Sequence, residues 1–198
     1  MELINDNNLN NNKNIEEIIQ NIFKTISLLK YGFIDKNGKT HRKTKKEFYF
    51  EHYRLQTPEE TLKYKYGTCW DQVELIRNLL EKVNIKCDTY LINYNDDSKI
   101  AKHTFVTVND NNFTYCLEYS FILKGKNIKF DSVENILKYF LEIFPIMFGI
   151  KDIDVNKIEI YKYNKPENFG LTFNEFVNYC RNQEKIDIQK LNVEYNNK

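Results

Sequence analysis

The spacing of apolar residues changes near residue 87, and this change constrains the fold more than any other feature of the sequence. Before it, apolar residues recur every three or four positions in two stretches that begin near Ile15 and Cys69, a pattern typical of amphipathic helices. After it, segments 87–94, 103–108 and 113–123 are rich in β-branched and aromatic residues, which predicts three strands. Helices followed by an antiparallel sheet indicate an α+β domain rather than a doubly wound parallel one.

Local signals predict the remaining elements. A short helix begins at Thr57-Pro58-Glu59-Glu60, which supplies an N-cap, a proline in the first turn and a capping-box glutamate. We expect Gly67 to end that helix and Pro145 to stop a later helix over 132–144. A strand over 157–163 and a helix over 172–180 complete the pattern.

One domain fits a chain of 198 residues. Residues 1–13 are rich in asparagine and have too few apolar residues to build a core, so we expect a disordered tail there. We assign residues 14–183 to a single domain and residues 184–198 to a C-terminal tail.

Charge and composition exclude several classes of function. The 29 basic and 28 acidic side chains give a net charge of +1, which does not favour binding to nucleic acid or to an anionic membrane surface. No apolar run approaches the length of a membrane span or a secretory signal, so we expect a cytoplasmic protein. The four cysteines form no CxxC pair, which suits a reducing compartment and argues against a paired zinc site.

Cys69 differs from the other cysteines because it lies where a helix should begin. The unpaired N–H groups of a helix N-terminus favour a thiolate, so we expect a lowered pKa for this thiol. A nucleophilic thiol also needs a base, and His103 is the best of the three histidines, since His41 lies in a basic loop and His52 has the pattern of a structural residue. Glu118, in an otherwise apolar strand, needs a polar partner. For Cys87, Cys116 and Cys180 we expect ordinary packing roles.

Three short stretches carry a resemblance to a known family: "GTCWD" at a helix start, "HTFVTV" on a strand and an acidic residue on the next strand. Over Pro58 to Phe121 the sequence resembles the transglutaminase-like superfamily, a branch of the papain-like cysteine-protease fold. The resemblance implies a central helix that carries Cys69 and packs on an antiparallel sheet, with Cys69, His103 and Glu118 as catalytic triad. The third member is usually aspartate, so Glu118 is one methylene longer. The backbone N–H of Cys69 and the side chain of Gln56 or Gln72 are candidate donors to an oxyanion.

These residues predict thiol-dependent acyl transfer without a metal or organic cofactor. A cysteine hydrolase, a peptidase or amidase acting on a protein, a peptide or a small amide, is the preferred reading. One alternative is a transglutaminase or acyltransferase with an amine acceptor. Another is a catalytically silent protein-binding module of the same fold. A zinc site formed by Cys69, His103 and Cys116 is disfavoured because the chain lacks the close ligand pairs of zinc sites.

The hairpin between the second and third strands gives a geometric prediction. If Asp110 and Asn111 form a two-residue turn, His103 and Glu118 lie directly opposite each other and point to the same face of the sheet. We further expect that face, which would include Phe105 and Cys116, to pack against the helix of Cys69.

Overall fold

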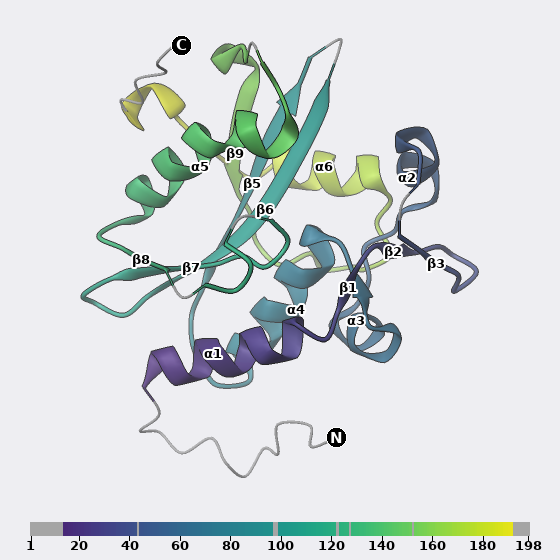
Figure 1. The fold of residues 1–198 in the computed structure, drawn as a ribbon, viewed down its shortest axis with the longest axis horizontal. Helices are drawn as coiled ribbons and strands as arrows, with labels where there is room; N and C mark the ends of the chain where they lie inside the picture. Colours follow the sequence, from purple (N-terminus) through teal and green to yellow (C-terminus); the bar gives the residue numbers. More distant parts are fainter. Residues whose placement is uncertain are drawn as a thin grey trace.

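A six-stranded antiparallel sheet organises the protein, with strand order β10-β9-β5-β6-β7-β8 (Figure 1). The computed structural model describes residues 14–42, 44–96, 99–121, 123–126, 128–151 and 153–191. The sheet consists of β5 (Asp88–Asn95), β6 (Ile100–Asn109), β7 (Thr114–Leu117), β8 (Ile128–Phe130), β9 (Ile158–Lys162) and β10 (Glu184–Ile186). The helices are α1 (Ile15–Ile26), α2 (Lys46–His52), α3 (Pro58–Tyr64), α4 (Cys69–Glu81), α5 (Val133–Phe148) and α6 (Phe173–Arg181), with 3-10 turns at Val155–Lys157 and Ile188–Leu191.

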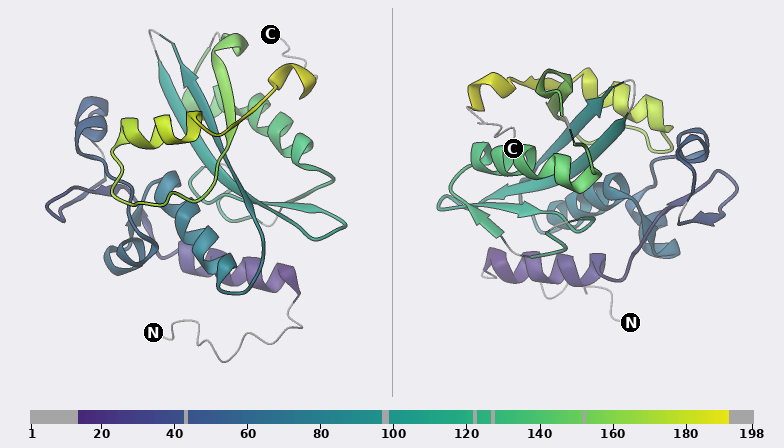
Figure 2. Two further views of the ribbon diagram at one scale, coloured as in Figure 1. Left: turned by 180° about the vertical axis from the view of Figure 1, so that it is seen from behind. Right: turned by 45° about the horizontal axis from the view of Figure 1, so that its top comes forward.

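Helices cover both faces of this sheet (Figure 2). On one face, α1, α4 and α6 pack against side chains that include Val106, Val108 and Leu117. On the other face, α5 packs against side chains that include Phe105 and Cys116. Because helices cover both faces, β5 to β7 are almost continuously buried, and their buried positions include polar residues such as Asn93, His103 and Thr104. The α+β class and the central cysteine-bearing helix on an antiparallel sheet are as predicted.

Two pairs of short strands lie outside the main sheet. β1 (Lys30–Tyr31) pairs in parallel with β4 (Tyr66–Gly67), and β2 (Phe33–Ile34) pairs with β3 (Thr40–His41). The first pairing places Tyr31 opposite Gly67, two residues before the start of α4. A segment far away in sequence is thereby held beside Cys69.

The helix α3 begins at the predicted cap and ends before the predicted residue. Thr57 and Glu60 form the expected capping box of α3. That helix ends at Lys65, which adopts a left-handed φ of 57°, rather than at Gly67.

The helix α5 does not stop at Pro145, contrary to prediction, but continues to Phe148. Proline removes one N–H from a helix, which costs stability. Phe144, before the proline, is completely buried, and Met147 and Phe148, after it, pack against the same core. We attribute the continuation to this apolar packing, and Gly149 then ends the helix with a left-handed φ of 61°.

The predicted C-terminal boundary at residue 183 is too early. β10 pairs with β9 through Glu184, Lys185 and Ile186, and Leu191 is buried against the α5 side of the sheet. The part of the predicted tail that the structure describes, 184–191, therefore belongs to the domain. The predicted tail over 1–13 lies outside the described residues. Within the described part of the chain, no helix is both long and apolar enough to cross a bilayer.

Candidate active site

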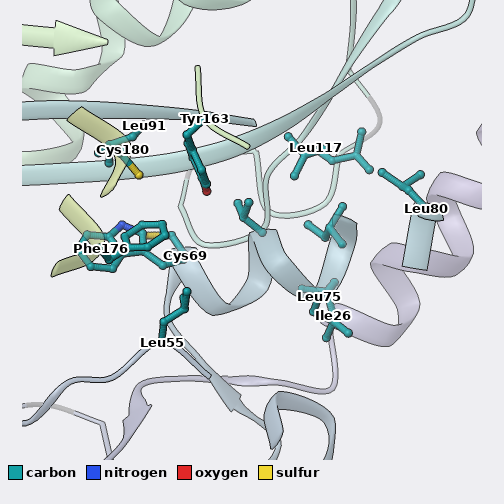
Figure 3. Packing of buried hydrophobic residues seen from close by; sticks show 14 of the residues in the cluster. Ile26, Leu55, Cys69, Leu75, Leu80, Leu91, Leu117, Tyr163, Phe176 and Cys180 are labelled. Carbon is teal, nitrogen blue, oxygen red and sulfur yellow. The ribbon is translucent and has the colours of Figure 1, made fainter. Parts of the chain in front are cut away.

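Cys69 is the first residue of α4, as the sequence predicts. Figure 3 shows it at the start of this helix, beside Leu55 and Phe176. Gly67 makes the tight approach possible, since a Cβ there would lie 3.2 Å from side-chain atoms of both Asp71 and Thr61. The start of the central helix is thus packed closely against α3.

Asp71 holds this helix start in place. Its Oδ2 accepts hydrogen bonds from the backbone N–H and the hydroxyl of Thr68, each at 2.8 Å. Its Oδ1 accepts from the Tyr53 hydroxyl and the Gln56 backbone N–H, each at 3.0 Å. The carboxylate is fully buried, and burial raises its pKa even though these hydrogen bonds lower it. The sequence places Asp71 in the first turn but gives no sign of its long-range partners.

The pKa of the Cys69 thiol is raised in this structure, contrary to our expectation of a lowered pKa. Burial raises the pKa of the thiol to about 11, and this outweighs hydrogen bonds with the side chain and backbone of Thr104 and the side chain of Tyr31, which lower it. Neither contact residue is a predicted site residue, because both lie on strands, β1 and β6, that are far from Cys69 in the sequence.

A cavity of about 450 Å³ opens beside Cys69. Its lining contains aromatic and basic side chains that come from β1, β2, α2, α4, β6 and α6, from the end of α5 and from the residue after β3. They include Phe33, Arg42, Lys46, Tyr49, Phe50, Trp70, Lys102, Phe148 and Phe173. Neither His103 nor Glu118 belongs to the described lining. The cavity is large enough for a side chain and part of a peptide backbone.

His103 and Glu118 lie together on the α5 face. His103 Nε2 is 3.6 Å from Glu118 Oε1, and both side chains are almost completely buried. At this separation they are close but not hydrogen-bonded, and both ring nitrogens lack a hydrogen-bond partner among the described residues. The ring instead contacts Phe121 and Phe140, with centroids 5.6 and 5.5 Å away.

Burial favours the neutral form of both members of this pair. It lowers the pKa of His103 to about 3, and it raises the pKa of Glu118. Backbone N–H groups partly offset the second effect: Phe121 donates to Glu118 Oε1 at 2.7 Å and Leu123 donates to Oε2 at 3.2 Å. A neutral imidazole is the form that can accept a proton from a thiol.

The predicted hairpin register is wrong by two residues. Val106 pairs with Leu117 and Asn109 pairs with Thr114, so the loop has four residues rather than two. Asp110 Oδ1 stabilises this loop by accepting hydrogen bonds from the backbone N–H groups of Asn112 and Phe113. A shift of two residues keeps side chains on the same face, so His103 and Glu118 still share one, although Glu118 follows the end of β7.

The predicted face was also wrong, because His103 packs under α5 whereas Cys69 packs on the opposite side of the sheet. Side chains alternate along a strand, so Thr104, and not His103, points toward the α4 side. In this structure the three predicted triad residues therefore do not form a connected triad. The zinc alternative is disfavoured for the same reason, and the described residues contain no group of three potential metal-ligating side chains.

The edge of β6 nevertheless brings Cys69 near the backbone of His103. Among the described residues, β7 pairs with β6 only from Val106 to Asn109, so the earlier part of β6 has no strand beside it on that edge. The backbone interaction of Cys69 is with Thr104. The amide nitrogen of Thr104 belongs to the peptide bond that links it to His103. The thiol and the imidazole are thus separated by the strand backbone, with the ring turned toward α5.

The side chains of Gln56 and Gln72, the two candidate oxyanion donors, already donate hydrogen bonds to backbone carbonyls. Gln56 Nε2 donates to the Tyr66 carbonyl at 3.3 Å, and Gln72 Nε2 donates to the Gly67 carbonyl at 3.2 Å. Gln72 Oε1 also accepts a hydrogen bond from the Ser120 hydroxyl. Neither glutamine is among the described residues that line the cavity.

Comparison with known families places this site in context. A sequence model of the transglutaminase-like domain matches residues 4–142, which include Cys69, His103 and Glu118. The chain belongs to the transglutaminase-like domain family. No curated protein sequence matches it.

Two structures of Legionella pneumophila LapG are among those similar to this transglutaminase-like domain. One has a TM-score of 0.41 and 12% identity, covering 63% of this chain and 60% of LapG. The other, calcium-bound, has a TM-score of 0.45 and 13% identity, covering 84% of this chain and 73% of LapG. The match thus spans less than two thirds of the first LapG chain.

Proposed function

We propose that this transglutaminase-like domain is a thiol-dependent acyl-transfer enzyme, and that its reaction is hydrolysis of a peptide or amide bond. Cys69 is the nucleophile, His103 the base and Glu118 the residue that orients the imidazole. The observation that supports this most is the placement of the Cys69 thiol, which lines an open cavity at a helix N-terminus and contacts the edge of β6 next to His103.

The reaction follows from these roles. The neutral imidazole takes the thiol proton, and the thiolate forms a bond to the carbonyl carbon of the substrate. The carbon–nitrogen bond then breaks, and the imidazolium gives its proton to the leaving amine. Water, deprotonated by the same imidazole, attacks the thioester and releases the acid and the free thiol. If an amine takes the place of water, the same steps give acyl transfer.

This proposal requires His103 to change its position. Its ring must leave the contacts with Phe121 and Phe140 and pass around the edge of β6 to reach the thiol. Among the described residues no strand pairs with this part of β6 on that edge, so no hydrogen bonds between strands have to break for the ring to pass. Phe121 also contacts Phe148, which lines the cavity, so substrate entry and movement of these aromatic rings are coupled in the proposal.

A catalytically silent binding module is the second candidate, and one observation favours it. The Cys69 thiol, with its pKa raised to about 11, and the buried imidazole lie on opposite sides of the sheet. If the ring never crosses the edge, the cavity binds a protein segment without reacting with it.

Alkylation at about pH 6 separates the two candidates. Only a thiolate reacts with iodoacetamide, so an assembled triad makes Cys69 the fastest of the four cysteines, as mapped by mass spectrometry of the native protein. In the silent module, Cys87 reacts first, because it is partly exposed while Cys69 is 5% exposed. Replacing His103 by Ala slows Cys69 modification only in the enzyme. Equal slow rates at Cys69 with and without His103 would leave the binding module as the function.

A further inference from the structure

The cavity beside Cys69 has an unbalanced charge. Of the described residues that line it, Arg42, Lys46 and Lys102 are basic and none is acidic. None of the three forms an ion pair with another described residue. The whole chain carries a net charge of only +1, so this concentration of cations is local to the cavity.

Lys102 is the most enclosed of the three basic groups. It lies partly buried on β6, where its ammonium contacts the neutral amide oxygen of Asn93 and lies 5.7 Å from the centre of the Phe173 ring. Burial and the nearby Arg181 lower the pKa of Lys102 to about 8, although Glu159 raises it. Burial removes water from the Lys102 ammonium, and a bound anion would replace the lost solvation with a favourable charge interaction.

The carboxylates of Asp71 and Glu159 do not neutralise the cavity. Asp71 lies close enough to raise the pKa of Cys69, but its oxygens already accept four hydrogen bonds beneath the first turn of α4. Glu159 accepts hydrogen bonds from Asn93, Arg181 and Lys185, and it is not part of the described lining. The cavity therefore presents cations and aromatic rings to a ligand.

We infer that the cavity binds a carboxylate near the reacting carbonyl of the substrate, as in a peptide with glutamate or aspartate beside the bond to be broken. This inference rests on the proposed function for the reaction but not for the binding. Lys102 contacts the carboxylate inside the cavity, while the exposed Arg42 and Lys46 attract it at the entrance. The aromatic side chains contact the apolar part of the same residue.

Binding can be measured without catalysis, because Trp70 lines the cavity and is the only tryptophan of the chain. The probes are N-acetylglutamate α-amide and N-acetylglutamine α-amide, which differ by one charged group. Titration followed by tryptophan fluorescence should show tighter binding of the acid by about threefold or more, decreasing with added salt. Lys102→Gln should remove this preference, and Lys46→Gln, at an exposed position, should reduce it. Lys24→Gln in α1, outside the lining, is the matched control.

Alkylation at about pH 7.5 gives a second readout that does not need an assembled triad, since Lys102 is still largely protonated there and the small ionised fraction of the thiol reacts slowly. The ratio of the iodoacetate rate to the iodoacetamide rate at Cys69 should exceed the ratio for unfolded protein and fall in Lys102→Gln. Equal affinity for the two amides would overturn the inference. If neither amide binds, a rate ratio equal to that of the unfolded chain would overturn it as well. Failure of His103→Ala to affect Cys69 near pH 6, by contrast, bears only on the proposed reaction.

Discussion

Asp71 is the residue on which the position of the thiol most depends. Its two oxygens accept four hydrogen bonds from Thr68, Tyr53 and Gln56 in a site without solvent access. In Asp71→Asn an amide NH₂ replaces one oxygen and faces donors, so two buried groups lose their acceptor. We expect the free energy of unfolding to fall by about 3 kcal/mol, measured by urea titration. Asp187→Asn, at an exposed position, should change it by less than about 0.5 kcal/mol. Equal effects would mean that Asp71 does not brace the helix.

At the same scale, the sequence predicts which residues matter better than it predicts how they meet. Cys69 begins its helix, and the buried Glu118 has polar partners in the backbone N–H groups of Phe121 and Leu123, as the local patterns lead one to expect. The side of the sheet that each residue occupies does not follow from them, because β6 is buried on both faces and each face mixes apolar and polar residues, so its pattern does not distinguish them. Thr104 and Tyr31, which contact the thiol, are ordinary residues that long-range pairing brings to the site.

Among the elements, the helix α5 contains a proline that should lower the stability of the folded protein. Pro145 lies inside this helix, four residues after Leu141, whose carbonyl would otherwise accept a backbone N–H. Pro145→Ala should therefore stabilise the protein by about 1 to 2 kcal/mol, after allowance for the greater freedom of the unfolded chain. Thermal unfolding measures this, and Ile146→Ala at a position that is 78% exposed is the control. A destabilised Pro145→Ala variant would show that the proline is accommodated by a bend that the core requires.

The sequence predicts a helix or strand correctly where the segment is long enough to show a clear periodicity or where it begins with a recognisable cap. The helices α1, α3, α4 and α6 and the strands β5, β6 and β9 all correspond to predicted segments. The two-residue strands β1 to β4 and the short helix α2 have no such signal, because tertiary contacts stabilise them more than their own residues do. The hairpin register also depends on the side chain of Asp110, which selects a four-residue loop that the "NDNN" composition alone leaves open.

At the scale of the whole molecule, the burial of His103 without hydrogen bonds to its two ring nitrogens should lower the free energy of unfolding. Both nitrogens lose water on folding and gain no hydrogen bond among the described residues, while the ring sits between aromatic side chains. His103→Leu keeps a similar volume and removes the polar atoms, so we expect it to be more stable than the wild type at pH 7.5 by about 1 to 2 kcal/mol. Such a cost to stability fits the proposed role of His103 as the base.

The pH dependence of stability tests the same residue with a definite sign. The unfolded chain protonates His103 near its ordinary pKa of about 6.5, whereas the folded protein resists protonation until the pH is near 3. Between these values the unfolded state binds the extra proton, so the wild type loses about 1.4 kcal/mol for each pH unit below about 6. The advantage of His103→Leu in urea titrations should therefore widen from pH 6 to pH 4.5 and stay constant above pH 7. Glu118 and other buried acids contribute to both proteins and cancel in the difference.

A constant difference across this range would mean that His103 accepts a proton in the folded state. Retained thiol reactivity in His103→Leu would then exclude the imidazole as the base of Cys69.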